Sequence, residues 1–490
     1  MKQTRRVFLQ RSLLSVPLLG TLSACGGGSA SSNAVAAPGP AGPSAPMFQP
    51  GADLTAGPGV KGTGLVNYSP LPKPLKLQTV TDPDFGSKIT RITDAQKDWN
   101  SAVACPAYPT TQAWNADETL LILYVTAPIS TGGIEAKWGL FDGNTYVFKQ
   151  WLPINPADVE QFYWSTTDPA TLFYVDNGQE GSAGPNQGWW NKLTAFNVST
   201  GVKTVVHDFS TDFTGTGPLG TLNAQYGAIN KVSGGEDPFA MSLDNDLIGL
   251  GAYLNKNGPG GSAAFQAFSY RISTNTIGTS FLVEGDVPQA LPSGRGTYFY
   301  NSSTSVNALN AVTNKVVLNL PFNGYEHTDL LRNAAGDDII AGVQYDGPSG
   351  SGTLMWANLT KGGSIKTLIG PAAGGPYPPS GTLTSGRAYR NPGWVAQGIV
   401  GNIQAVKTYL DQEVLIANLD TSYIRRVAHH RSTGAWSNAS QSNYWAQPNV
   451  TISPSGTRIL FQSDWGAATP GNSVVANPNA VVDTYVVDVT

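Results

Sequence analysis

Four residues near the C-terminus could together carry out acid–base chemistry on a sugar that bears a carboxylate. His430 and Arg431 are adjacent, and Tyr444 and Gln447 follow shortly after them. An arginine can neutralise a uronate carboxylate and acidify the neighbouring C–H proton, while an imidazole or a phenol removes or returns a proton. These residue types indicate a site for β-elimination. A hydrogen-bonded anchor for the surrounding loop would explain the same residues equally well.

The remaining histidines differ in how well they could serve such a site. His327 follows Glu326 at the start of an expected strand, and adjacent side chains of an extended strand point to opposite faces. Only one of these two can therefore face a common site. The same rule separates His429 from His430, which cannot both bind one metal ion unless the strand bulges. His207 ends an outer strand and is expected to lie on the surface or to take part in blade packing.

Other polar and aromatic side chains are candidates for substrate binding. Polar residues just before expected inner strands would converge on one face, and they include Gln112, Glu160, Gln161, Glu236, Asp237, Gln289, Glu326, Gln447 and Asn449. Trp189 and Trp190 lie in SAGPNQGWWNK, whose Gly, Asn and Gln content indicates an exposed loop that could stack on a sugar ring. The alternative roles are capping of strand ends for the polar residues and packing between sheets for the aromatic ones.

A recurring hairpin pattern positions these side chains. In Asn449–Asp464, NVTISPSGTRILFQSD, a Ser-Pro-Ser-Gly turn separates two apolar strands; Pro suits the second turn position and Gly supplies positive φ. Five further inner hairpins resemble it, a seventh near 394–410 is faint, and six outer hairpins follow turns such as Phe141–Asn144. Longer insertions are expected at 211–236 and 370–394.

The two ends of this repeat predict a closed ring. The last strand, 485–490, stops where an outer turn would begin, and 87–93 is an unpaired strand of the kind that follows such a turn. We therefore predict an all-β fold, a seven-bladed β-propeller over residues 75–490, in which the N-terminal strand completes the last blade. Closure leaves no free sheet edge. A β-sandwich or two smaller β domains would not explain the two end strands.

The C-terminal motifs also carry a family resemblance. SPSGTRILFQSDWG, preceded by YWAQPN and HHRS, resembles the C-terminal blades of TolB-type propellers and, more specifically, the oligogalacturonate lyase group. In that group a divalent metal bound by histidines and a glutamine lies in the channel, and elimination cleaves uronate-containing chains. The resemblance implies His430 and Gln447, with His327, as ligands of a metal such as Mn²⁺ or Ca²⁺. Pro448 and Asn449 stand where further histidine ligands would be expected.

The N-terminus predicts export. Thr4–Gln10 resembles a twin-arginine signal, Leu13–Leu22 is apolar but too short to span a bilayer, and Leu22–Cys25 resembles a lipobox that would place a lipid on Cys25. Residues 1–25 would then be an export signal and 26–74, poor in charged and large apolar residues, a disordered tether. This predicts a periplasmic or outer-membrane lipoprotein that meets the membrane through its lipid only. The alternative is an ordinary secretory signal with a chance cysteine.

The composition argues against nucleic-acid binding and against a CxxC metal site. Four of the 29 Lys and Arg residues lie in 1–25, so the remaining 25 face 33 Asp and Glu, and no basic run remains to bind nucleic acid. Cys105 is the only other cysteine, which excludes a CxxC metal site. The leading hypothesis is a propeller that recognises an extracellular polysaccharide and cleaves it by elimination. The competing hypothesis is a non-catalytic interaction platform in the cell envelope.

Overall fold

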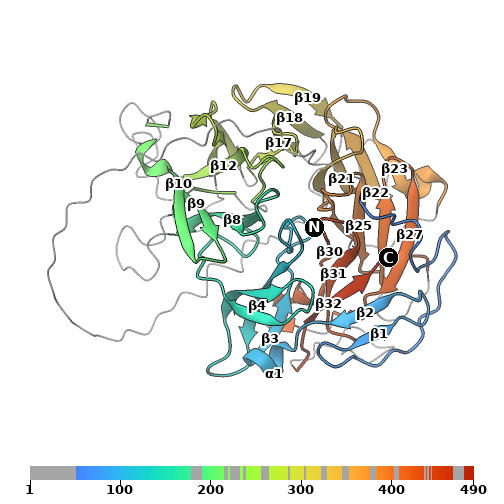
Figure 1. Ribbon diagram of the computed structural model, residues 1–490. Helices are drawn as coiled ribbons and strands as arrows, with labels where there is room; N and C mark the ends of the chain where they lie inside the picture. Colours follow the sequence, from blue (N-terminus) through green and yellow to red (C-terminus); the bar gives the residue numbers. More distant parts are fainter. Residues whose placement is uncertain are drawn as a thin grey trace, which may run out of the picture.

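Seven antiparallel sheets stand around a common centre in a computed structural model of the chain (Figure 1). The structure describes residues 51–177, 190–213, 219–220, 232–234, 239–254, 264–284, 287–302, 305–321, 328–344, 352–375, 382–401, 408–434, 437–438, 441–442, 444–466 and 479–490. Within these residues the predicted seven-bladed β-propeller is confirmed.

Blades one to four follow one another along the chain, each with its innermost strand first. Blade one contains β3 (Ser101–Cys105), β4 (Leu120–Pro128), β5 (Ala136–Asp142) and β6 (Phe148–Trp151). Blade two contains β7 (Phe162–Trp164), β8 (Thr171–Asn177), β9 (Trp190–Asn197) and β10 (Val202–Asp208). Blade three contains β11 (Val232–Ser233), β12 (Leu247–Leu254), β13 (Ala264–Arg271), β14 (Thr276–Ile277) and β15 (Phe281–Glu284). Blade four contains β16 (Gln289–Ala290), β17 (Gly296–Ser302), β18 (Ser305–Asn310) and β19 (Val316–Leu320).

Blades five to seven complete the ring. Blade five contains β20 (Asp329–Arg332), β21 (Asp338–Gln344), β22 (Gly352–Asn358) and β23 (Lys366–Ile369), and blade six contains β24 (Thr382–Ser385), β25 (Trp394–Ile399), β26 (Glu413–Asn418) and β27 (Tyr423–His429). Blade seven contains β30 (Thr451–Ile452), β31 (Arg458–Ser463), β32 (Asp483–Asp488), β2 (Lys88–Arg91) and β1 (Thr79–Thr81). The connections hold α1 (Ala95–Trp99), the short hairpin β28 (Ser437–Asn438) and β29 (Gln441–Ser442), and the single-turn helices η2 (Phe209–Thr211), η3 (Pro371–Ala373) and η4 (Tyr444–Ala446). None of the helices in the described ranges has the length and apolar character needed to cross a membrane.

The closing strand pairs as the sequence predicts. β2 runs antiparallel to β32, with Ile89 opposite Val487 and Arg91 opposite Tyr485, and β1 adds a fifth strand outside β2 (Figure 1). Ile89 and Val487 are both fully buried. Blade seven is therefore built from both ends of the folded region, so the ring closes through sheet hydrogen bonds.

The outer turns share one local device. Asp142, Asn197, Asn310, Asn358 and Asn418 each use a side-chain oxygen to accept hydrogen bonds from the backbone N–H groups two and three residues further on. An Asx side chain held this way replaces backbone partners that the turn lacks. This is why Asp or Asn begins each of these turns.

Apolar cores lie between successive blades. Between blades one and two, Ile122 and Leu140 pack against Phe162, Trp164 and Tyr174. Comparable clusters join blades two to three, four to five, five to six, six to seven and seven to one. Burial of these faces drives the blades together and holds the ends of the innermost strands in a ring.

Two sequence boundaries need correction. The predicted tether over 26–74 does not extend through residues 51–74: Leu54 is fully buried in the core between blades six and seven, and its carbonyl accepts a hydrogen bond of 2.6 Å from Arg425 Nη2. The predicted insertion at 370–394 contains β24, the innermost strand of blade six. That strand is mostly hydroxyl-bearing, so it lacks the apolar alternation by which the other strands are recognised.

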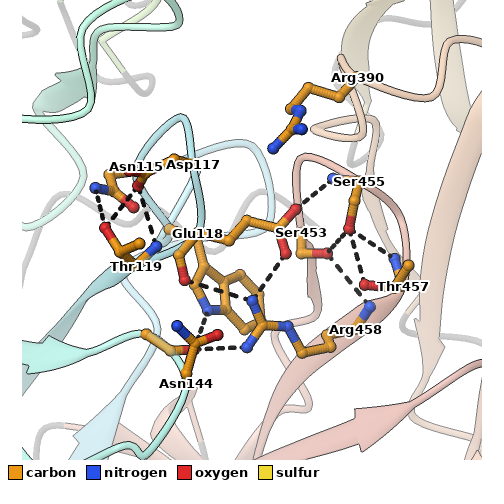
Figure 2. Close-up of polar contacts among 12 residues, drawn as sticks. Asn115, Asp117, Glu118, Thr119, Asn144, Arg390, Ser453, Ser455, Thr457 and Arg458 are labelled. Carbon is orange, nitrogen blue, oxygen red and sulfur yellow. Dashed lines mark hydrogen bonds and ion pairs between the residues drawn. The ribbon is translucent and has the colours of Figure 1, made fainter. Parts of the chain in front are cut away.

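A polar contact locks blade seven to blade one. The Arg458 guanidinium reaches from the start of β31 to Glu118, with 2.8 Å between Nη2 and Oε2, and its Nη1 donates to the Gly143 carbonyl at 2.5 Å (Figure 2). It also lies 5.1 Å from the ring centre of Trp114. The other Glu118 oxygen accepts from Ser455 N at 2.6 Å, so the first turn of each blade holds the other.

Candidate functional site

The central channel is filled where the innermost strands converge. Six blades line a cavity of about 20 Å³ there through Gln112, Tyr163, Met241, Ala290, Leu330 and Arg387, among others. That volume holds roughly one water molecule. At this level the described part of the channel has no room for a sugar ring.

The predicted ring of polar residues connects blades. Gln112 of blade one donates from Nε2 to the carbonyl oxygens of Arg387 in blade six and Ile452 in blade seven, at 3.0 and 2.9 Å. Gln161, next to β7, accepts a hydrogen bond of 2.7 Å from the backbone N–H of Gly234 in blade three. Glu160 is buried, and its carbonyl accepts from Thr111 Oγ1 at 3.4 Å. The side chains of Gln112, Gln161 and Thr111 therefore connect blades around the channel.

The channel also contains a buried ion pair that the sequence does not predict. Asp329 of blade five accepts hydrogen bonds from Arg387 Nε at 2.9 Å and from Gly386 N at 2.6 Å. Burial raises the pKa of the Asp329 carboxyl, against the opposing effect of the Arg387 guanidinium. The pair joins blades five and six, and only the fold brings its two members together.

His430 is an anchor in this arrangement. Its ring is fully buried, Nε2 donates to the Ile399 carbonyl at 2.9 Å, and Nδ1 accepts from Ser432 N at 3.0 Å. Burial lowers the pKa of His430 to about 4, so the imidazole is neutral near neutral pH. Both ring nitrogens are engaged, and neither is directed to a ligand.

Arg431 also makes internal contacts. Its Nη1 donates to the Ser69 carbonyl at 2.9 Å, its Nη2 lies 3.5 Å from Asp82 Oδ2, and its guanidinium lies over the rings of Tyr68 and Trp465. The Arg431 backbone adopts φ +57°, in the left-handed region. The Arg431 side chain thus binds residues 68–82 to the crossing between blades six and seven.

The other members of the predicted site gather on the crossing into blade seven. Tyr444 opens η4 and is half-buried, with its ring 5.1 Å from that of Trp445. Gln447 is half-buried and Asn449 is buried just before β30. The structure thus brings Tyr444, Gln447 and Asn449 onto one short segment, whereas the His430 ring bonds toward β25.

Several predicted site residues lie outside the described residues. These are Cys25, Trp189, Glu236, Asp237, Glu326 and His327, and only the backbone of Trp190, at the start of β9, is described. Metal binding by His327, His430 and Gln447 therefore stays a prediction. In the described ranges, the acidic and imidazole groups with a spacing suited to a cation are Asp82, Asp84 and His429, at the rim between blades six and seven.

A groove of about 560 Å³ opens between blades five and six, away from the predicted residues. Three turns and the outer strand β23 form it, and the residues that line it include Asn333, Asp337, Trp356, Lys361, Lys366 and Asp420. Pockets for small ligands commonly measure roughly 300–1,000 Å³. The groove is therefore large enough for part of an oligosaccharide.

The polar groups of the groove are held in place. Lys361 Nζ lies 2.6 Å from Asp337 Oδ2, and this hydrogen bond lowers the pKa of the Asp337 carboxyl. Asn358 donates to the same oxygen at 2.9 Å. Lys366 Nζ lies 4.4 Å from the ring centre of Trp356. The sequence does not predict this groove, because its residues come from turns and an outer strand of two blades, whereas the predicted site residues precede inner strands.

Comparisons with known proteins found similar structures but no similar sequence family. No family model and no curated protein matches the sequence. A solved oligogalacturonate lyase in complex with manganese is 13% identical, with a TM-score of 0.49 over 85% of this chain and 96% of that chain. An oligogalacturonate lyase from Vibrio parahaemolyticus is 12% identical, with a TM-score of 0.49 over 84% and 96%. The WD40 domain of Neurospora crassa Pan2 is 10% identical, with a TM-score of 0.38 over 81% and 97%.

Proposed function

We propose that this chain is an exported propeller that binds an acidic oligosaccharide in the groove between blades five and six, without cleaving it. The observation that carries the proposal is the difference in volume between the groove and the central cavity. The groove measures about 560 Å³ and the central cavity about 20 Å³. Of these two hollows, the groove is the one large enough for sugar rings.

The chemistry of the lining suits a uronate. Lys366 lies over Trp356 and has no acidic partner among the described residues, so its ammonium can meet a sugar carboxylate. Asn333, Asp420 and Ser422 offer amide, carboxylate and hydroxyl groups to sugar hydroxyls. Because the chain as a whole is acidic, a polyanion would be attracted through such a local cation rather than through net charge.

Two observations support binding without cleavage. The groove lining contains neither histidine nor tyrosine. The imidazole of His430, one of the sequence candidates for proton transfer beside Tyr444 and His327, is fully buried and bonded at both nitrogens. Elimination needs a base within hydrogen-bonding reach of the proton it removes.

The test is titration of the purified protein with a panel of acidic and neutral oligosaccharides, followed by calorimetry. Lys366→Ala should weaken binding of acidic members by about tenfold or more, since it removes a charge-assisted contact. Lys137→Ala is the matched control, because Lys137 lies over Trp151 of blade one at 5.9 Å in the same kind of contact, and it should bind as the parent does.

Two outcomes would contradict the proposal. Equal binding by the parent and by Lys366→Ala would remove the groove as the site, and a silent panel would favour a protein-interaction platform instead. Growth of the ultraviolet absorbance of unsaturated uronates during incubation would show that the protein cleaves its ligand.

The place of action is part of the proposal. The order of arginine pair, apolar run and Leu-Ser-Ala-Cys supports export and lipid attachment at Cys25, with membrane contact through the lipid alone. Cys25→Ser should move the protein from the membrane fraction to the soluble fraction of the envelope. Unchanged fractionation would argue against the lipid anchor.

A further inference from the structure

His429 ends β27 with a buried and unsatisfied side chain. It is fully buried, and neither Nδ1 nor Nε2 has a hydrogen-bond partner in the part of the chain that the structure describes. A buried polar atom left without a partner destabilises the folded state, and such atoms are uncommon in native proteins. The adjacent His430, by contrast, is bonded at both nitrogens. The described residues therefore leave both nitrogens of the His429 ring available to a ligand.

Two carboxylates lie beside this ring. One ligand atom from each of Asp82, Asp84 and His429 can be chosen so that all lie within 4.8 Å of one another, and Asp84 Oδ2 is 3.8 Å from His429 Nδ1. Both acids belong to the turn between β1 and β2, which the ring closure brings against β27. Metal–ligand bonds of roughly 2.0–2.2 Å place two ligands at most about 4.4 Å apart. Side-chain shifts of a few tenths of an ångström would therefore bring all three groups onto one ion.

The surroundings orient all three groups. Tyr68 and Phe85 pack edge-on against the imidazole with ring centres 4.7 and 4.8 Å away. Ser69 donates to both oxygens of Asp84, from N at 2.8 Å and from Oγ at 2.6 Å. Hydrogen bonds of this kind fix the direction of a metal-binding carboxylate.

The charge balance leaves room for a cation. Arg431 Nη2 is 3.5 Å from Asp82 Oδ2, and Arg426 is paired with Glu413 at 3.1 Å, on the strand pair that ends at His429. Three carboxylates thus face two guanidinium groups. From the described residues the Asp82 Oδ2 atom receives only long contacts, of 3.4 Å from His429 N and 3.5 Å from Arg431, so it retains a lone pair for a metal.

We propose that Asp82, Asp84 and His429 bind a divalent first-row transition metal, Zn²⁺ or Mn²⁺, at the rim between blades six and seven. One imidazole with two carboxylates suits these ions better than Ca²⁺ or Mg²⁺, which prefer oxygen ligands alone. The ion joins the closing N-terminal segment to the outer strand of blade six. It lies away from the groove, and its role is to strengthen closure of the ring.

The test starts from full-length protein stripped with a chelator and dialysed. Reloading with Zn²⁺ or Mn²⁺ should give one tightly held ion per chain by elemental analysis and should raise the melting temperature. Asp84→Asn and His429→Gln should each weaken binding by more than the roughly 10–100-fold that loss of an outer partner costs. His207→Gln is the matched control, because His207 also faces an acid, Asp212 at 2.6 Å, and it should bind metal like the parent.

Three results would overturn the proposal: no saturable metal binding by the parent, unchanged binding in both folded variants, or a preference for Ca²⁺. Should the variants fail to fold, Co²⁺ added to the parent protein decides. A saturable visible d–d absorption that Zn²⁺ displaces would support the site, and its absence would contradict it.

Discussion

The Asp483 carboxylate accepts a hydrogen bond of 2.9 Å from Arg91 Nη2, across the junction between the two ends of the folded region. Lys73 Nζ lies 2.8 Å from the same carboxylate oxygen, and Ala95 N donates to the other at 2.9 Å. Asp483 is fully buried. The closure of the ring therefore contains a buried ion pair as well as sheet pairing.

Removing this carboxylate should destabilise the whole ring. Asp483→Ala leaves Arg91 buried without its principal partner, and loss of one member of a buried pair costs about 3–5 kcal/mol. Urea unfolding measures the difference in free energy of unfolding. Asp98→Ala is the control, since Asp98 pairs with Lys76 where both side chains are partly exposed, and it should cost under about 1 kcal/mol. Equal effects would mean that closure does not depend on Asp483.

The contact between blades seven and one should be similarly sensitive. Arg458→Ala removes the partner of Glu118 and the cation over Trp114, and we expect a loss of about 3 kcal/mol in the free energy of unfolding. Arg295→Ala is the comparison, because Arg295 is 58% exposed and lies 3.7 Å from Asp338, and its loss should be under about 1 kcal/mol. A small effect at Arg458 would show that packing alone holds these two blades.

The architecture was predictable from the sequence because its signals are local. An Asx residue that caps an outer turn, such as Asn197, bonds only to its own next few residues, so its effect is visible in the letters. The pairing of Ile89 with Val487 is distant, but it follows once the strands are counted around a ring. The strand β24 was not predictable in this way, because its residues are mostly hydroxyl-bearing and lack an apolar alternation.

The candidate site was much less predictable. The sequence shows that His430 is a histidine near a tyrosine and a glutamine, but it does not show that Ile399 and Ser432 occupy both ring nitrogens. The groove is formed by turns that lie far apart in the chain, such as those that hold Asp337 and Asp420. The spacing of these residues in the sequence therefore does not predict it. Site geometry depends on long-range packing, whereas hairpins depend on neighbours.

Acid should remove part of the stability that Asp246 provides. Although burial raises the pKa of this carboxyl, hydrogen bonds from Ser273 and Arg271 outweigh it and hold the pKa below its ordinary value of 3.8. The unfolded chain then binds the proton more readily than the native one. The contribution is therefore present above the unfolded pKa and is lost as pH falls through the folded one.

The difference in free energy of unfolding between the parent and Asp246→Asn should accordingly shrink from about pH 5 to about pH 3. Asp338→Asn gives the opposite sign, because burial raises the pKa of Asp338 and its ionisation disfavours the native state as pH rises through that range. Parallel curves for the two variants would contradict both assignments.

Replacement of His430 distinguishes a structural role of this residue from a role in catalysis or ligand binding. His430→Ala leaves the buried carbonyl of Ile399 and the N–H of Ser432 without partners, at a cost of about 1–3 kcal/mol for each orphaned group. The free energy of unfolding should fall accordingly, while oligosaccharide affinity, measured by calorimetry on the folded fraction, should stay within about twofold of the parent. Lys366→Ala should show the reverse pattern, with weaker binding and little change in stability, because its ammonium lies in the groove beside Trp356. A variant at His430 that folds as stably as the parent and loses binding would place the imidazole at the ligand after all.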